Sequence, residues 1–300
     1  MNRYSSYKPS DKSGRKRTFL SLKFLAAGTV ALFLGVHFFA SGDIKLANLP
    51  IVNHKASATA IDTVVLSQYQ QDAMAETINS AISVAEGMRV GVAIEDLNDG
   101  HVYSYGVTKP LVAASVGKLI TAVDFLHQTE SGRYSLDDSL KNGVAGQELK
   151  QLIVLSDNQA WDDFNTLLTH NGLSGYVSQI GLGNYDSHVN SLTASEVAAF
   201  LGKIYRGQLL NKDNTRLLLS YMKDADYSTY IPASVPEGIT VYHKAGWLPE
   251  RVNDAAIIEA GNHPYTLVIF SEAKDGSYNA RSGHKLFASV TEATLKAFAQ

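Results

Sequence analysis

Residues 111–120 read LVAASVGKLI, and this stretch decides how the rest of the chain is interpreted. It places Ser115 three residues before Lys118 in an apolar setting. At the start of a helix this spacing puts both side chains on one face, and the helix N-terminus favours negative charge developing near the serine. A lysine that is partly desolvated and beside other cations has a lowered pKa and can take up the serine proton. The alternative is a purely structural role, in which Ser115 is a helix cap and Lys118 a surface lysine.

The Ser-x-x-Lys spacing has little value alone, because it also begins at Ser5, Ser13 and Ser282. The first two lie in a basic N-terminal tail, and Ser282 begins the lead-in to the last predicted helix. Of these four copies, only the one at Ser115 is surrounded by apolar residues. Ser115 is therefore the candidate nucleophile.

A second motif, Ser156-Asp157-Asn158, lies between two predicted apolar helices. A turn there would present the Ser156 hydroxyl and the Asn158 amide together. Ser, Asp and Asn all favour helix caps, so an ordinary capping turn is the alternative interpretation.

The third motif is Lys244-Ala245-Gly246, at the end of a predicted strand that precedes two further strands. Gly246 would let a substrate backbone approach closely. The backbone N–H of Trp247, with that of Ser115, would form an oxyanion hole. Lys12-Ser13-Gly14 matches a Lys-[Ser/Thr]-Gly pattern literally, but it precedes the nucleophile and lies in the basic tail.

Periodicity predicts an α/β (α+β) fold. A capping box at Ser67 begins a helix that runs to Gly87, and strands follow at 89–96 and 101–105 around an Asn-Asp-Gly turn. Helices are expected at 114–129, 147–155, 159–170, 193–206 and 214–222, then strands at 240–245, 254–260 and 265–272, and a final helix at 285–299. The strands come from both ends of the domain, which predicts one antiparallel sheet with a helical subdomain beside it and a cleft between them.

Composition excludes several chemistries. The 300 residues include no cysteine, so disulfides, thiolate zinc sites and cysteine nucleophiles are ruled out. A net charge of −3 gives no electrostatic basis for binding nucleic acid. The histidines at 54, 170, 188, 243 and 284 lack metal-ligand spacing, and no Gly-rich phosphate loop is present. We expect no metal and no cofactor.

The N-terminus predicts export. Six Lys and Arg side chains within residues 1–18 precede an apolar run from Phe24 to Ala40, and the stretch counted from Phe19 is long enough to span a bilayer as a helix. Flanking positive charge holds that end in the cytoplasm. We therefore expect a cytoplasmic tail at 1–18, a single-pass signal anchor at 19–40, an extracytoplasmic linker at 41–66 and a folded domain at 67–300. A signal peptide cleaved near residue 42, giving a secreted protein, is the alternative.

With the three motifs in this order, residues 67–300 resemble the class A β-lactamase and penicillin-binding-protein superfamily of serine hydrolases. The resemblance implies a β-lactamase/transpeptidase-like fold with a five-stranded antiparallel sheet. It implies that Ser115 is the acylated nucleophile and Lys118 its base. Ser156 would relay a proton to the leaving nitrogen, Asn158 would hold the substrate amide, and Lys244 would attract the substrate carboxylate.

The chain departs from that pattern in two places. Class A β-lactamases carry a glutamate after the Ser-Asp-Asn motif that activates the deacylating water, whereas residues 180–192 read IGLGNYDSHVNSL and contain only Asp186 as a carboxylate. A missing general base typically costs about 10²–10⁴-fold in rate. Ala245 replaces a Ser or Thr whose hydroxyl would bond a substrate carboxylate, a loss of ~1.5–3 kcal/mol. Arg251 is the candidate substitute.

Two hypotheses follow. The first is a membrane-anchored serine hydrolase acylated by a β-lactam or a D-alanyl peptide of the cell wall. Within it, a D-Ala-D-Ala carboxypeptidase or a penicillin-binding protein with slow deacylation is the alternative to a β-lactamase. The second is a non-catalytic protein that binds cell-wall peptides.

Overall fold

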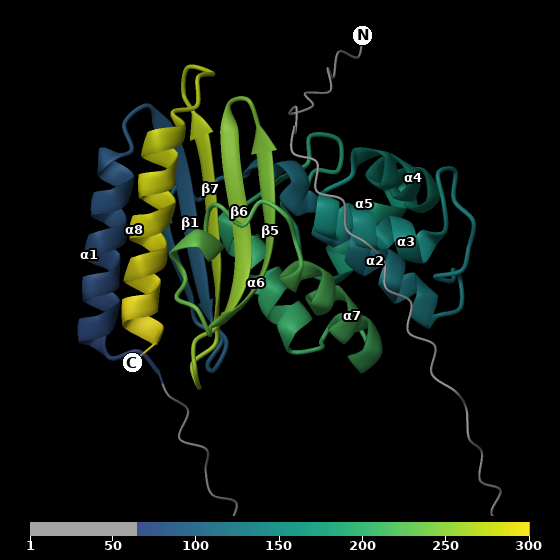
Figure 1. Cartoon of the computed structure of the whole chain (residues 1–300), viewed down its shortest axis with the longest axis horizontal. Helices are drawn as coiled ribbons and strands as arrows, with labels where there is room; N and C mark the ends of the chain where they lie inside the picture. The colour runs from purple at the N-terminus through teal and green to yellow at the C-terminus, as the bar shows by residue number, and fades with distance from the viewer. Residues whose placement is uncertain (1–64, 300) are drawn as a thin grey trace, which may run out of the picture. The chain divides into compact units, whose positions relative to one another are not determined.

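The computed structural model describes residues 65–299, and its centre is a five-stranded antiparallel sheet. The strand order is β2-β1-β7-β6-β5 (Figure 1). The strands are β1 (Met88–Asp96), β2 (Val102–Gly106), β5 (Thr240–Leu248), β6 (Arg251–Glu259) and β7 (Tyr265–Ala273). The predicted sheet, built from both ends of the domain, is confirmed, and β5 forms one of its two edges.

Helices cover both faces of the sheet. Helices α1 (Gln68–Val84) and α8 (Ala280–Phe298) lie side by side on one face, and α6 (Ala194–Tyr205) lies behind the sheet on the other (Figure 1). The side chains of β1 alternate accordingly: Val92 and Ile94 belong to the core under α1 and α8, and Ala93 belongs to the core shared with the helical part. The central strands β1, β7 and β6 are therefore buried on both faces, whereas the edge strand β2 is partly exposed.

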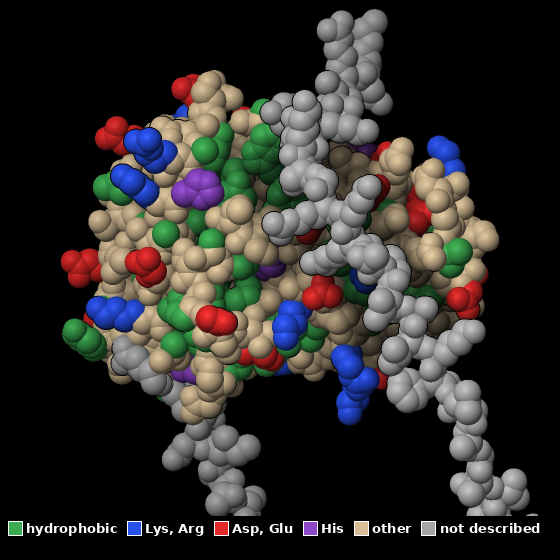
Figure 2. All heavy atoms as spheres, in the orientation of Figure 1, with side chains coloured by type: hydrophobic (Ala, Val, Ile, Leu, Met, Phe, Trp, Pro, Cys, Tyr) green, Lys and Arg blue, Asp and Glu red, His purple; other side chains and the backbone are tan. Residues whose placement is uncertain are grey.

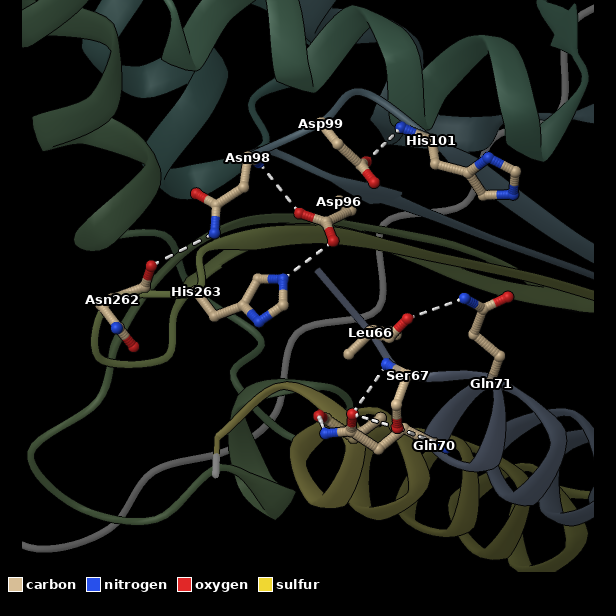
Figure 3. Close-up of polar contacts among 11 residues, drawn as sticks. Leu66, Ser67, Gln70, Gln71, Asp96, Asn98, Asp99, His101, Asn262 and His263 are labelled. Atoms are coloured by element: carbon tan, nitrogen blue, oxygen red, sulfur yellow. Dashed lines mark hydrogen bonds and ion pairs between the residues drawn. The ribbon is translucent and has the colours of Figure 1, made fainter. Parts of the chain in front are cut away.

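The capping box predicted at Ser67 is present (Figure 3). The Ser67 backbone N–H donates to Gln70 Oε1 at 2.9 Å, and the Gln70 N–H donates to Ser67 Oγ at 3.4 Å. These reciprocal bonds satisfy N–H groups that have no partner within the helix. They fix where α1 begins.

The turn between β1 and β2 is tied to the neighbouring β6–β7 connection by a buried pair. His263 Nε2 lies 2.8 Å from Asp96 Oδ2, and both residues are almost fully buried (Figure 3). Asp96 also accepts a bond from the Asn98 N–H at 2.9 Å. A buried carboxylate requires such partners. The pair therefore holds the end of β1 against the β6–β7 connection.

The helical part is inserted between β2 and β5. It holds α2 (Lys118–Glu130), α3 (Ala145–Lys150), a π-helical turn (Gln151–Leu155), α4 (Asn158–Leu168), α5 (His170–Gln179) and α7 (Lys212–Lys223), with a short pair of strands, β3 (Leu111–Val112) and β4 (Ser191–Leu192). Three expectations were wrong here. Residues 114–117 form a 3₁₀ turn (Ala114–Gly117) before α2, the single helix at 147–155 is split, and α5 was missed.

The predicted tail, the signal anchor and all but the last two residues of the linker lie outside residues 65–299. Within those residues, no helix combines the length and apolar character needed to cross a membrane. On the face shown in Figure 2, acidic and basic side chains are interspersed over the described surface.

We predict that Ser67→Ala lowers the free energy of unfolding of the full-length protein by about 1 kcal/mol, because it removes the cap of α1. Urea denaturation followed by circular dichroism measures this change. Ser80→Ala is the matched control, since Ser80 is exposed within the same helix. Equal stability of the two variants would contradict a capping role for Ser67.

Candidate active site

Ser115 lies in the 3₁₀ turn Ala114–Gly117, and Lys118 is the first residue of α2. In a 3₁₀ turn, side chains three residues apart stand one above the other. The Lys118 backbone N–H donates to the Ser115 carbonyl, so Ser115 and Lys118 are joined across one turn of the backbone. Ser115 is half-buried, whereas Lys118 has no exposed surface.

Asn190 holds this turn in place. Its side-chain Nδ2 donates to the Ala114 carbonyl at 2.7 Å, and its backbone carbonyl accepts from the Ala113 N–H at 2.8 Å. A Cβ on Gly117 would lie 2.0 Å from Asn190 Oδ1, so only glycine permits this approach. Asn190 was not predicted from the sequence, because a single asparagine in a loop carries no pattern.

The three residues of the second motif, Ser156, Asp157 and Asn158, have different structural roles. Asp157 is the N-cap of α4, where its Oδ1 accepts from the N–H groups of Gln159 at 2.7 Å and Ala160 at 3.0 Å. The capping interpretation is thus correct for Asp157 alone. Ser156 has a left-handed backbone, with φ of 57° and ψ of 36°, and turns the chain between the π-helical turn and α4. Ser156 and Asn158 are both left facing the amine of Lys118.

The Lys118 amine bonds to both of these residues. Its Nζ donates to the Ser156 carbonyl at 2.5 Å and to Asn158 Oδ1 at 2.7 Å, and it lies 3.3 Å from Ser156 Oγ. The ring centre of Trp161, a residue that the sequence analysis missed, is 5.2 Å from the same atom. The first two motifs are therefore joined through one nitrogen atom.

Burial, and to a smaller extent the nearby charge of Lys244, lower the pKa of Lys118 to about 7. The carboxylates of Asp157 and Asp162 oppose the shift. A large fraction of Lys118 is consequently neutral near pH 7, and a neutral amine has a lone pair that can accept a proton. The pKa matches the requirement for a general base.

Lys244 is almost completely buried in β5, and its Nζ donates to the carbonyl of Ala245 at 3.2 Å. Burial lowers its pKa to about 8, while Asp254 and Asp226 act in the opposite direction. Lys244 is thus the more highly charged of the two buried lysines at neutral pH. The third motif lies within an edge strand, as expected, although β5 continues three residues further than predicted.

Gly246 brings β5 against the backbone of Ser115, the predicted nucleophile. A Cβ at this position would lie 2.8 Å from the backbone nitrogen of Ser115 and 2.9 Å from the carbonyl oxygen of Ala113. The contact is backbone to backbone, so no side-chain movement can relieve it. The next residue, Trp247, is on the same edge strand, and its side chain is 62% exposed.

A buried pair that was not predicted from the sequence, His243 with Asp254, links β5 to β6 next to Lys244. His243 Nδ1 lies 3.1 Å from Asp254 Oδ1, and the other carboxylate oxygen of Asp254 accepts from the Ile231 N–H at 3.2 Å. His243 Nε2 is 3.4 Å from Ser228 Oγ. These contacts attach the loop at 224–231 to the strand that carries Lys244.

Asn253 of β6 makes a further link between the sheet and the nucleophile. Its Nδ2 donates to the Val112 carbonyl at 2.8 Å, and its Oδ1 accepts from the Ser271 N–H at 3.2 Å. Val112 precedes the Ser115 turn by two residues. The sheet therefore positions Ser115, the predicted nucleophile, through Asn253 as well as Gly246.

Asp186 is poorly suited to act as a base. It is exposed, and its Oδ1 accepts from the N–H groups of His188 at 2.8 Å and Val189 at 3.2 Å. These two bonds hold the pKa of the carboxyl below its usual value. Asp186 stabilises its own turn.

Arg251 has other partners. Its guanidinium is 2.8 Å from Glu250 Oε1 and 3.8 Å from Glu272 Oε2. Its charge is already compensated, which weakens the suggestion that it replaces the missing hydroxyl at Ala245.

Other features lie apart from these residues. A cavity of about 620 Å³ is lined by Tyr205, Arg206, Lys212, Tyr242 and neighbours in α7, and none of the predicted site residues lines it. Within residues 65–299, no group of three or more His, Asp or Glu side chains is arranged to hold a metal ion.

A sequence model of the β-lactamase enzyme family matches residues 73–298. The chain belongs to that family. The matched range contains all three motifs, and members of this family are serine hydrolases, as is this chain. No curated protein sequence matches the chain.

Solved structures share the fold of this family member. PBP-A is 22% identical with a TM-score of 0.68, covering 75% of this chain and 95% of its own. A β-lactamase from Chitinophaga pinensis is 20% identical with a TM-score of 0.68, covering 75% and 98%. TLA-1 extended-spectrum β-lactamase is 17% identical with a TM-score of 0.69, covering 75% and 99%. At these identities the similarity establishes the β-lactamase/transpeptidase-like fold.

We predict that Gly246→Ala slows acylation of Ser115 by p-nitrophenyl acetate at least about 100-fold, because the new methyl group displaces the Ser115 backbone. Stopped-flow absorbance measures this rate. Gly175→Ala is the control, since a Cβ at Gly175 meets no atom within 4 Å. A rate for Gly246→Ala within twofold of the control would refute the close packing of β5 on the nucleophile.

Proposed function

We propose that this protein is a membrane-anchored serine hydrolase that is acylated on Ser115 by a β-lactam or by a D-alanyl peptide amide of the cell wall. Water then hydrolyses the acyl-enzyme. One observation carries the proposal: the amine of Lys118 is buried, has a pKa of about 7 and bonds to both Ser156 and Asn158. A buried neutral lysine beside a serine is the arrangement that activates a serine nucleophile.

The proposed reaction begins when Ser115 Oγ attacks the carbonyl carbon of the substrate and its proton passes to Lys118 Nζ. The backbone N–H groups of Ser115 and Trp247 stabilise the resulting oxyanion. The C–N bond then breaks, and Ser156 relays a proton to the leaving nitrogen. Water finally hydrolyses the ester and restores the Ser115 hydroxyl. The 3.3 Å separation of Lys118 Nζ and Ser156 Oγ supports the relay.

Two residues would bind the substrate. Asn158 accepts from Lys118 with its Oδ1, which leaves its NH₂ group to donate to a substrate carbonyl. Lys244 supplies the positive charge for a substrate carboxylate. With alanine at 245, no hydroxyl assists Lys244 there, so binding of that carboxylate is weaker than in relatives that have Ser or Thr.

Deacylation is proposed to be slow. Asp186 is the only carboxylate in the loop at 180–192, and its oxygen is committed to two backbone N–H groups. This supports a penicillin-binding protein or D-Ala-D-Ala carboxypeptidase over an efficient β-lactamase. A mutant of the similar protein PBP-A is described as an acyl-enzyme complex with penicillin G.

The membrane anchor is proposed from the sequence alone. Six basic residues within 1–18 precede the apolar run at 19–40, which places the catalytic domain outside the cytoplasm. Cleavage near residue 42, giving a secreted enzyme, is the alternative. In either case the domain faces the compartment where cell-wall peptides occur.

Intact-mass spectrometry with benzylpenicillin tests the chemistry. We predict one covalent adduct per chain that persists for hours, because Ser115 is acylated and no carboxylate activates the deacylating water. Ser115→Ala should form no adduct. Ser282→Ala, which changes the serine of another Ser-x-x-Lys sequence, is the matched control and should react like the unmodified protein.

The other outcomes are equally informative. An adduct that persists in Ser115→Ala would refute the assignment of the nucleophile. Loss of the antibiotic without a lasting adduct would identify a working β-lactamase. The absence of both adduct and turnover would favour the non-catalytic binder of cell-wall peptides.

A further inference from the structure

Two large apolar side chains are exposed beside Ser156. Leu155, which directly precedes it, is 53% exposed, and Tyr227 of the loop at 224–231 is 61% exposed. Large apolar side chains that stay in contact with water next to a reactive centre commonly mark a binding surface.

One hydrogen bond joins the two segments that carry these residues. The backbone N–H of Asp226 donates to the carbonyl of Val154 at 2.9 Å. Each partner of this bond is next in the chain to one of the exposed residues, Leu155 or Tyr227. The carboxylate of Asp226 is also close enough to Lys244 to influence its pKa. The pair therefore adjoins both the second and the third motif.

The loop that carries Tyr227 is held firmly. The Ile231 N–H bonds to buried Asp254, and Ser228 Oγ lies 3.4 Å from His243 Nε2. These contacts anchor the loop to β5 and β6 at the positions directly after Tyr227. Since the loop is anchored, the exposed ring is presented in a fixed position.

The backbone of Tyr227 is strained to achieve this. Its φ is 65°, in the left-handed region that glycine and asparagine adopt easily and that an aromatic residue rarely occupies. Strain of this kind persists where the surrounding structure imposes it and is concentrated at functional sites.

We propose that Leu155 and Tyr227 form a subsite for the leaving group, and that the preferred substrate releases a leaving group with a large apolar side chain. The inference rests on the proposed function, in which Ser156 delivers the proton to the leaving atom. Leu155 directly precedes Ser156 in the chain. A leaving group that receives its proton from the Ser156 hydroxyl therefore lies next to Leu155 and Tyr227. The apolar group covers the pair while the scissile bond lies at Ser115.

Two depsipeptide esters test the proposal on the full-length protein. Both have a phenylacetylglycyl acyl group, and their leaving groups are D-lactate and D-phenyllactate, so the carboxylate facing Lys244 is the same in both. Ser115 attacks the ester carbonyl, the C–O bond breaks, and the proton reaches the leaving oxygen. We expect kcat/KM for the phenyllactate ester to exceed that for the lactate ester by at least about tenfold.

The double variant Leu155→Ser with Tyr227→Asn should reduce this ratio to about 1–2. Asparagine is chosen because it accepts the left-handed backbone at position 227. Tyr69→Ser with Val84→Ser is the matched control, because both residues are exposed large hydrophobics at the ends of α1, and it should keep the full ratio.

The two possible failures are distinguishable. If both esters acylate Ser115 with equal efficiency, or if the double variant keeps the ratio, the subsite is refuted while the proposed function stands. If neither ester acylates Ser115, the proposed function fails and the subsite fails with it.

Discussion

The burial of Lys118 beside Lys244 is the constraint on which the site depends. Two ammonium groups in one water-poor region repel each other, and neither can be fully hydrated. Burial and the charge of Lys244 lower the pKa of Lys118 to about 7, and burial lowers that of Lys244 to about 8. A pKa near 7 suits Lys118 to the proposed role of base, and the buried charge of Lys244 suits it to the proposed role of carboxylate partner.

The five candidate site residues come from three separate segments of the chain. The 3₁₀ turn and the start of α2 supply Ser115 and Lys118, the residues at the start of α4 supply Ser156 and Asn158, and the edge strand β5 supplies Lys244. Backbone strain is concentrated where the pieces meet.

Ala114, Ser156, Asn190 and Tyr227 all have φ between 50° and 65°. Each costs on the order of 1–3 kcal/mol. Contacts around these residues hold the strained backbone: Asn190 bonds to Ala113 and Ala114, and the loop after Tyr227 bonds to Asp254 and contacts His243.

The sequence predicted the sheet and most helices from local signals, which are capping boxes and the alternation of apolar residues. Three short motifs singled out five polar side chains as candidate site residues, and their roles stay predictions. The sequence could not predict α5. The segment HNGLSGYVSQ contains two glycines and no strong helix signal, and its helix is stabilised by packing of Leu173, Tyr176 and Val177 in the core. Asn190, Asn253 and the His243–Asp254 pair were also missed. Each acts through contacts between residues distant in sequence, which no local pattern reveals.

The ionisation of Lys118 is the most direct test of this explanation of the site. Heteronuclear NMR of protein labelled at the lysine side chains, with the Lys118 resonance assigned by its absence in Lys118→Met, follows its Nζ as the pH is raised. A titration midpoint near pH 7 is the expected result, because burial and the charge of Lys244 both disfavour the ammonium form. A midpoint near the ordinary lysine value of about 10.4 would contradict the assignment of Lys118 as the base, since its amine would then be protonated throughout the physiological range.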